Sequence, residues 1–546
     1  MAIHDATPGH GRWLVPTLLL AVSGAPLTAV AAPGEATPVE EPSAPPAEGE
    51  PVAPRVEEPP AAEEPVAEVP SEEVPLEEVP LEEVPPPKAP PRDVPPEAGT
   101  VRVLRVSADP FGSGGHDEIF RHAAGRSTVD RGEIQQRGAA SFSEALSKLP
   151  GVRSLEGLSG VGSTSTKLNV GVRGASPDLS ENATVLLDEI PLAMAPYGQP
   201  ELSLFPVSLF ALDRIDAVRG GVSVRFGPQT SGGVFNLMTK PIPRTPEAAV
   251  STRVDQFGHA LMAAGFGTTV DRFGVYAEYA PQAGKSFRAN SNVQVHSGLL
   301  KLAYDPGPRV SIASTSHAYW EESGVPGGLT RAAYEEDRFG TIRPGDVFGG
   351  WRAGEAIKLG VRRREDRHFQ LFSYYNHSQR STRLTDLRTL DGQPTVRRIE
   401  RIYDTVGLEP RHALRMGREA GPFVDMTMGM RGTLELAQLG GSEVARDNPA
   451  MLSAYSDADA RVGALAAYVE QSHHLLDDSL VLEGGIRTEL IRLTRRDNLR
   501  TGSQGVISET AFGVVPSLSL WWSPRDEVST FVAYARSFGP ATFTQL

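Results

Sequence analysis

The 546-residue chain contains no cysteine. This absence excludes disulfides, thiolate zinc sites, iron–sulfur clusters and cysteine nucleophiles. The chain also lacks a Ser–His–Asp spacing, an H-E-x-x-H motif and any clustered metal ligands that would indicate catalysis. We therefore expect no enzymatic activity, no resident metal and no cofactor.

Long apolar runs are scarce as well. The run WLVPTLLLAVSGAPLTAVAA contains Pro16 and Pro26 and ends in the small-x-small pattern Ala29-Val30-Ala31. This pattern predicts a secretory signal peptide over 1–31, with a membrane anchor as the alternative. No other run approaches the roughly 18 apolar residues of a membrane-spanning helix, so we predict no helical span.

The net charge of −15 belongs to one segment. Residues 33–100 carry 18 acidic and 3 basic residues together with 20 prolines, whereas the chain from residue 101 onward has 49 of each sign. This balance gives no basic footprint for nucleic acid. Proline and like-charge repulsion favour an extended chain, so we predict that 32–99 is a disordered tether, either a spacer or a ligand for a partner.

Five glycines crowd the fourteen residues from Gly220 to Gly233. Gly227 and Gly232 have the spacing of a phosphate loop, but Gly233 and Val234 replace the Lys and Ser/Thr that such a loop needs. A nucleotide site is therefore not indicated.

Residues 100–246 have the composition of a small α+β domain. Ser141 followed by Glu144 predicts the capping box of one helix, which Pro150-Gly151 would end. The strand-like runs are TVRVLRV, KLNVGVRG, ATVLLDEIPL, DRIDAVRGG, VSVRFG and GGVFNLMTK.

Three of these stretches carry a family resemblance. The segments LNVGVRG, VLLDEIPLAMAPYGQPELSLFPVSL and LDRIDAVRGGVSVRFGPQTSGGVFNLMTK resemble the plug domain of TonB-dependent outer-membrane receptors, and within that family the ferric dicitrate receptors. The resemblance runs from about Leu168 to Lys240 and more weakly back to Thr128. It implies that the glycines let plug strands turn tightly and pack close to a barrel wall.

Residues 247–546 alternate in polarity with the period of a β-strand. Val424, Met426, Met428 and Met430 share one face of VDMTMGMRGTLEL, and FGVYAEYA and SLSLWW alternate in the same way. We predict an antiparallel transmembrane β-barrel whose apolar face contacts outer-membrane lipid. Thirteen strands are predicted near 247–256, 258–268, 271–281, 292–304, 309–320, 354–363, 367–378, 398–409, 422–434, 462–474, 479–492, 512–523 and 526–538.

The links between these strands alternate in length. The short links include 305–308, 364–366 and 477–478, and the long ones include 321–353, 379–397, 435–461 and 493–511. Short periplasmic turns and long outer loops are typical of outer-membrane barrels. Because plugged transporters have about 22 strands, we expect roughly nine strands beyond these and a truncated chain with an unpaired strand edge.

The resemblance implies a function and its partners. It implies an outer-membrane receptor that is secreted through its signal peptide and takes up Fe³⁺ citrate when a TonB-type periplasmic coupling protein displaces the plug. The segment Thr100, Val101, Arg102 and Val103 is the candidate box that pairs with this partner, or else the first plug strand. Another siderophore, heme, cobalamin, a non-transporting signalling role and a passive porin remain alternatives.

The resemblance also implies a ligand site at the outer apex of the plug. Arginine suits an anionic chelate because its fork binds carboxylates in a bidentate manner. The candidate ligand residues are Tyr197, Gln199, Gln229, Arg331, Arg380 and Arg383.

A separate set of residues would hold the plug in the barrel. The resemblance implies that Arg173 and Arg219 latch the plug to barrel glutamates, for which Glu435, Glu470 and Glu489 are candidates.

Overall fold

The computed structural model describes residues 125–546 apart from gaps at 140, 148, 155–167, 169, 173, 175–182, 220–223, 228–231, 391–392, 418–420, 446–447, 501–504, 526–527, 544 and 546. The expected signal peptide, tether and box candidate lie outside the described residues. Among the described residues, no helix is both long and apolar enough to cross a membrane.

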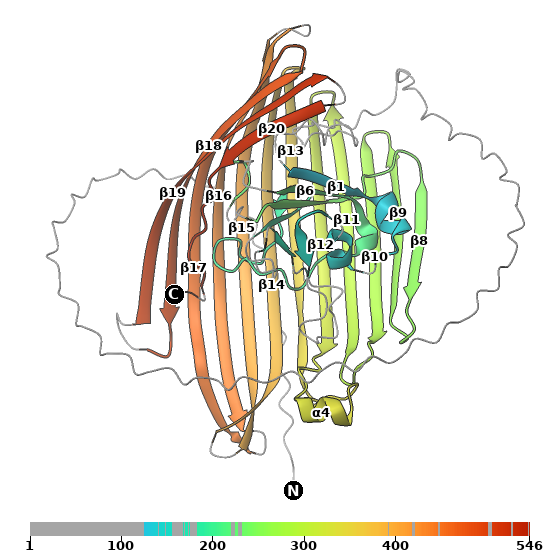
Figure 1. The fold of residues 1–546 in the computed structure, drawn as a ribbon, viewed down its shortest axis with the longest axis vertical. Coiled ribbons are helices and arrows are strands. Elements are labelled where there is room, and N and C mark those ends of the chain that lie inside the picture. Colours follow the sequence, from blue (N-terminus) through green and yellow to red (C-terminus); the bar gives the residue numbers. More distant parts are fainter. Residues whose placement is uncertain are drawn as a thin grey trace, which may run out of the picture. The chain divides into compact units, whose positions relative to one another are not determined.

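The N-terminal part of this region folds around a small sheet (Figure 1). Its strand order is β1-β6-β7-β4-β5, and a separate pair joins β2 to β3. Ile215, Phe235 and Leu237 are completely buried in its core, as expected for apolar residues of central strands. The strands are β1 Gly125–Asp130, β2 Val152–Ser154, β3 Val170–Val172, β4 Thr184–Leu187, β5 Ile190–Pro191, β6 Leu212–Arg219 and β7 Val234–Thr239.

Two short helices, rather than the one predicted, follow β1. The helix α2, Arg131–Gln136, begins at a complete capping box formed by Asp130 and Glu133. The helix α3, Phe142–Ser147, begins where the Glu144 N–H donates to Ser141 Oγ at 3.0 Å. The expected cap of α3 is thus confirmed, but the prediction of a single helix was wrong.

The run VSVRFG is also not a strand where it is described. Val224 and Arg225 lie in a turn, and Phe226 and Gly227 continue without strand pairing. Gly227 approaches the wall of the second sheet so closely that a Cβ there would lie 3.0–3.2 Å from the Arg487 guanidinium atoms. This close approach confirms the role expected for a glycine at this position.

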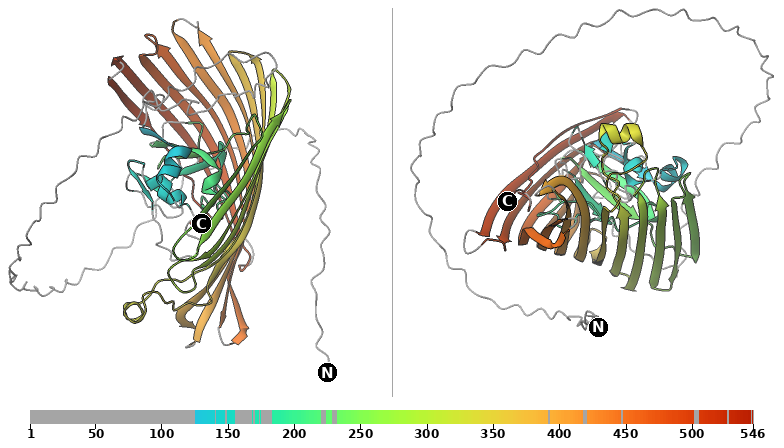
Figure 2. Two further views of the ribbon diagram at one scale, coloured as in Figure 1. Left: turned by 90° about the vertical axis from the view of Figure 1, so that its right-hand side faces the viewer. Right: turned by 90° about the horizontal axis from the view of Figure 1, so that it is seen from below.

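The second sheet contains the thirteen strands predicted, in simple antiparallel order from β8 to β20. It curves along its length (Figure 2), and β8 and β20 form its two ends. Its strands are β8 Glu247–Val254, β9 Ala260–Val270, β10 Phe273–Lys285, β11 Asn292–Gly307, β12 Val310–Gly324, β13 Val347–Arg364, β14 Arg367–Leu390, β15 Gln393–Gly417, β16 Phe423–Ala445, β17 Asn448–Leu475, β18 Leu480–Asp497, β19 Val506–Arg525 and β20 Val528–Ala535.

The two faces of this sheet differ as the alternation predicted. On β16, Met428 and Met430 are exposed, whereas Arg431 and Glu435 are buried on the opposite face against the N-terminal domain of β1 to β7, the predicted plug. On β19, Leu518 and Leu520 are exposed and Ser519 is buried. The sheet therefore presents an apolar outer face and a polar inner face.

The strand ends correct two predicted loops. The segments predicted as links, 379–397 and 435–461, are largely strand, because β14 reaches Leu390, β15 starts at Gln393, β16 reaches Ala445 and β17 starts at Asn448. The segment between β12 and β13 is a true loop and holds the helix α4, Arg331–Glu336.

Candidate functional site

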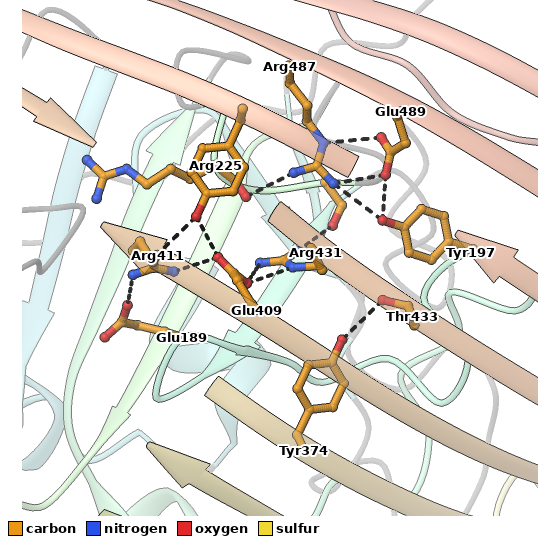
Figure 3. A network of polar contacts seen from close by, with 12 residues as sticks. Glu189, Tyr197, Arg225, Tyr374, Glu409, Arg411, Arg431, Thr433, Arg487 and Glu489 are labelled. Atoms are coloured by element: carbon orange, nitrogen blue, oxygen red, sulfur yellow. Dashed lines mark hydrogen bonds and ion pairs between the residues drawn. The ribbon is translucent and has the colours of Figure 1, made fainter. Parts of the chain in front are cut away.

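The site lies where turns of the plug meet the polar inner face of the barrel sheet. Three plug segments make these contacts: the β4–β5 turn, the turn at Tyr197, and the segment around Arg225. Figure 3 shows the buried network that receives them, with residues from β14 to β18 facing the plug.

The β4–β5 turn carries two adjacent carboxylates, both in the left-handed backbone region, with φ of 48° at Asp188 and 76° at Glu189. Asp188 accepts hydrogen bonds from the Thr239 N–H at 2.8 Å and the Thr239 hydroxyl at 2.6 Å, and it lies 3.4 Å from Lys301 Nζ. Glu189 pairs with Lys358 at 2.9 Å and Arg411 at 2.7 Å. This tight turn therefore directs two negative charges into cations of the wall.

Burial opposes ionisation of Glu189, but Lys358 and Arg411 outweigh it and lower the pKa of this carboxyl below its ordinary value of 4.5. We expect Glu189→Gln to destabilise the protein at pH 7. Because the folded pKa is lowered, the stabilisation is complete above 4.5 and is lost as the pH falls through the folded pKa. Unfolding of wild type and variant at several pH values measures the difference, and a difference that stayed constant below pH 4 would contradict the ion pairs.

The matched measurement for this turn is a double-mutant cycle. Glu189→Gln combined with Lys358→Met should give a coupling free energy of about 0.5–3 kcal/mol, because the two side chains contact each other. A coupling of zero would mean that Glu189 relies on Arg411 alone.

The turn at Tyr197 is clamped by two glutamates of the wall. The N–H groups of Tyr197 and Gly198 donate to the two carboxylate oxygens of Glu435, each at 2.9 Å. The Tyr197 hydroxyl donates to Glu489, which also pairs with Arg487 at 2.9 Å. Burial and the charge of Glu489 raise the pKa of Tyr197 well above its ordinary value, so the hydroxyl keeps its proton and acts as a donor.

The third plug segment forms a bidentate ion pair with the wall through Arg225. Arg225 donates to both oxygens of Glu470, at 3.2 and 3.1 Å. Two wall arginines also bind the backbone of this segment. Arg487 donates to the Arg225 carbonyl and Arg431 donates to the Gly227 carbonyl, both at 3.2 Å. A bidentate arginine–carboxylate pair fixes orientation as well as distance.

Behind these contacts the wall holds a buried network centred on Glu409. Its carboxylate pairs with Arg411 at 3.0 Å and Arg431 at 2.7 Å, and accepts the Tyr468 hydroxyl at 2.7 Å (Figure 3). Because Arg411 also reaches Glu189 and Arg431 also reaches Gly227, the network joins two plug segments.

All three glutamates named as latch candidates contact the plug, each through a different partner. Glu435 binds backbone N–H groups, Glu470 binds Arg225, and Glu489 binds Tyr197. The side chains of Arg173 and Arg219 lie outside the described residues, so their role stays a prediction.

The candidate ligand residues occupy different surroundings. Tyr197 is 1% exposed in the clamp, and Gln199, 8% exposed, donates to Glu201 at 3.4 Å. Arg380 forms an ion pair with Glu201, so the plug and β14 meet at this point.

Of the other candidate ligand residues, two are exposed and one lies outside the described residues. Arg383 is exposed and donates to the Gly345 carbonyl at 3.0 Å. Arg331 is exposed on α4 and pairs with Glu335 at 2.8 Å. Gln229 lies outside the described residues. The structure thus brings Tyr197, Gln199 and Arg380 to one plug segment and leaves Arg331 apart.

Sequence reasoning missed the plug residues Asp188, Glu189 and Arg225 and the wall residues Glu409, Arg411 and Arg431. The sequence does contain a signal for Asp188 and Glu189, because two adjacent acidic residues between short apolar runs indicate a hairpin turn. The sequence contains no signal for the wall residues that pair with this turn, since Glu189 and Arg411 are 222 residues apart in the chain.

Two family profiles match this chain. The TonB-dependent receptor plug domain matches residues 119–234, and the TonB-dependent receptor-like β-barrel matches residues 279–546. Together they include every strand from β11 to β20 and all three plug segments of the site.

Among curated proteins, the vitamin B12 transporter BtuB of Vibrio cholerae serotype O1 is 27% identical over 146 residues, which cover 27% of this chain and 22% of that protein. Among solved structures, the ferric citrate transporter FecA in its unliganded form is 28% identical with a TM-score of 0.72, covering 79% of this chain and 65% of that one. The ferric yersiniabactin uptake receptor FyuA of Yersinia pestis is 15% identical with a TM-score of 0.61, which shows the fold alone. The chain thus spans about two thirds of the length of these receptor structures.

Proposed function

Because the chain belongs to the TonB-dependent receptor family, we propose that it acts in the outer membrane of a Gram-negative cell and takes up an iron chelate, ferric dicitrate. The observation that carries this substrate is the 28% identity to the ferric citrate transporter FecA over 79% of the chain. The neighbouring siderophore receptors FyuA and PiuA are 15% and 13% identical, so their likeness supports the fold and no substrate.

The chemistry of the apex supports an anionic substrate. Arg380 on β14 pairs with Glu201 of the plug segment that contains Tyr197 and Gln199, and Arg383 follows three residues later on the opposite, exposed face of the strand. A citrate carboxylate competing with Glu201 for Arg380 would exchange an internal ion pair for one with the substrate. We propose Tyr197, Gln199, Gln229, Arg331, Arg380 and Arg383 as the ligand-binding residues.

Transport requires that the plug contacts be broken. The plug is held by ion pairs at Glu189 and Arg225 and by the Glu435 clamp at Tyr197. Breaking these contacts requires an input of energy, because buried charges are costly to separate from their partners. We propose that a TonB-type periplasmic protein supplies the force by pairing with Thr100, Val101, Arg102 and Val103, and that Arg173 and Arg219 add to the latch.

Uptake of ⁵⁵Fe-labelled ferric citrate tests this function. The receptor is expressed in cells that lack their own ferric citrate receptor, with and without the coupling protein. Uptake should appear with the receptor and vanish when the coupling protein is deleted. Uptake that persisted after the deletion would indicate a passive pore. Binding of ferric dicitrate without uptake in coupled cells would indicate a signalling receptor.

The BtuB relatives favour a second candidate substrate, cobalamin. Labelled cyanocobalamin is therefore the matched competitor in the same cells. Coupled uptake of cyanocobalamin with no uptake of iron would overturn the choice of ferric dicitrate and leave the receptor class intact.

A further inference from the structure

One buried arginine of the barrel wall has no carboxylate partner among the described residues. Four wall arginines are each 1% exposed, and three of them pair with glutamate at 3.0 Å or less: Arg411, Arg431 and Arg487. The fourth, Arg352 on β13, has only a 3.5 Å contact from its Nη2 to the amide oxygen of Asn376, and its Nε has no hydrogen-bond partner.

An isolated buried cation is unfavourable, since the protein interior replaces its water shell with nothing of opposite charge. The other three arginines show how this wall normally meets that cost, with a glutamate in contact. At Arg352 a bound anion would supply the negative charge that glutamate supplies to the other three arginines.

Polar groups next to Arg352 are arranged for the same anion. His317 on β12 and Asn376 on β14 both lie opposite Gly354 in the strand registers, and a Cβ on Gly354 would overlap both side chains. The His317 Nε2 atom is buried without a hydrogen-bond partner. The Arg352 Nε–H and the His317 Nε2 atom thus both lack a hydrogen-bond partner, on neighbouring strands of the sheet.

A cavity of about 240 Å³ lies between the β4–β5 turn of the plug and strands β11 to β14, and Arg352 contacts Asn376 of its lining. His317 and Asn376 line it, and so do both wall lysines that pair with the plug turn, Lys301 and Lys358. Three carboxylates, those of Asp188, Glu189 and Glu355, also line the cavity, and the first two are the present partners of the two lysines.

The strand register orders these cations along β13. Arg380, which pairs with plug residue Glu201, lies opposite Gly350. Arg352 is the next inward-facing position, and Lys358 lies three such positions further toward the short-turn end. Arg380, Arg352 and Lys358 therefore follow one another in this order along the inner face of β13 and β14.

We propose that this cavity binds a small carboxylate anion, with Arg352 as its countercharge and His317 and Asn376 as hydrogen-bonding partners. A bound carboxylate competes with Asp188 and Glu189 for Lys301 and Lys358, so its arrival weakens the ion pairs of the plug turn. The choice of citrate as the natural anion rests on the proposed function, whereas the anion site itself does not.

Crystals of the receptor soaked in sodium bromide locate the site without reference to transport. We expect an anomalous bromide peak next to Arg352 in the wild type and in Arg363→Met, which removes an exposed arginine of the same strand. The peak should be absent in Arg352→Met. A wild-type map without a peak at Arg352 would overturn the proposal.

Calorimetric titration with iron-free citrate tests the carboxylate. We expect Arg352→Met to weaken citrate binding at least tenfold, Arg352→Lys to restore part of it, and Arg363→Met to change it less than twofold. Gly354→Ala, which displaces His317 and Asn376 but keeps Arg352, should also weaken it. Equal citrate affinity in wild type and Arg352→Met overturns the proposal, and a bromide peak without citrate binding means an adventitious ion only.

The uptake assay separates the two ideas. If citrate binds at Arg352 but ferric citrate is not transported, the proposed function fails and the anion site stands. If ferric citrate is transported and the Arg352→Met receptor binds citrate normally, the anion site fails and the proposed function stands.

Discussion

Replacing Glu409 by alanine should lower the free energy of unfolding of the receptor by about 3–5 kcal/mol, because it strands two buried arginines without their shared carboxylate. Arg411 and Arg431 are each 1% exposed, and both pair with Glu409. In the variant, Arg411 keeps Glu189 as a partner. Arg431 loses Glu409, its carboxylate partner among the described residues. Denaturant unfolding of the receptor in lipid vesicles measures the loss.

The control for Glu409 lies on the same strand. Glu400 is exposed on β15, and Glu400→Ala should change the unfolding free energy by less than about 0.5 kcal/mol. Glu409→Gln should fall between the two, since the amide keeps an acceptor for Tyr468 but loses the charge. A loss below 1 kcal/mol in Glu409→Ala would mean that the arginines find water or other partners.

Replacing Glu435 by alanine should release the plug turn at Tyr197. The change leaves the N–H groups of Tyr197 and Gly198 buried without their acceptors, at a cost of about 1–3 kcal/mol for each donor. Hydrogen–deuterium exchange of residues 193–201 should therefore become at least tenfold faster, since each 1.4 kcal/mol corresponds to about a factor of ten.

Two observations keep the Glu435 result specific. Glu435→Gln retains one carbonyl acceptor, so its exchange rate should lie between those of wild type and Glu435→Ala. Exchange in β10 and β11, which lie away from β16 in the sheet order, should not change. Faster exchange throughout the barrel would indicate general destabilisation and not release of one turn.

The strand count followed from the sequence, but the strand lengths did not. Where the apolar residues face outward, as at Met428 and Met430, the period-2 pattern is plain. Beyond that zone the pattern reverses: in β17, Asp457 and Asp459 are exposed while Ala458 is buried. A rule that seeks apolar residues on the outer face therefore started the predicted strand at residue 462, whereas β17 starts at Asn448.

Helix α2 was missed for a different reason. Its capping box, Asp130 followed by Glu133, stands in the sequence, but the helix has only six residues and buries only Ile134. A helix this short has almost no hydrophobic period to detect, so only its cap could have revealed it.

The sequence indicated three wall glutamates that contact the plug, but not their partners. Glu435, Glu470 and Glu489 were singled out by resemblance, and all three contact the plug. Their partners depend on which plug turn reaches which strand, and that is set by packing between segments more than 200 residues apart. Arg225 and Glu470, for example, are separated by 245 residues.

The paired extensions of β14 to β17 limit how the outer end of this protein can change. Strand pairing continues to Leu390 opposite Gln393 and to Ala445 opposite Asn448. A single added residue in either arm would turn every side chain beyond it from the lumen to the exterior, because neighbouring residues of a strand face opposite ways. The sheet should therefore tolerate insertions here two residues at a time, or together with bulges that absorb the odd residue.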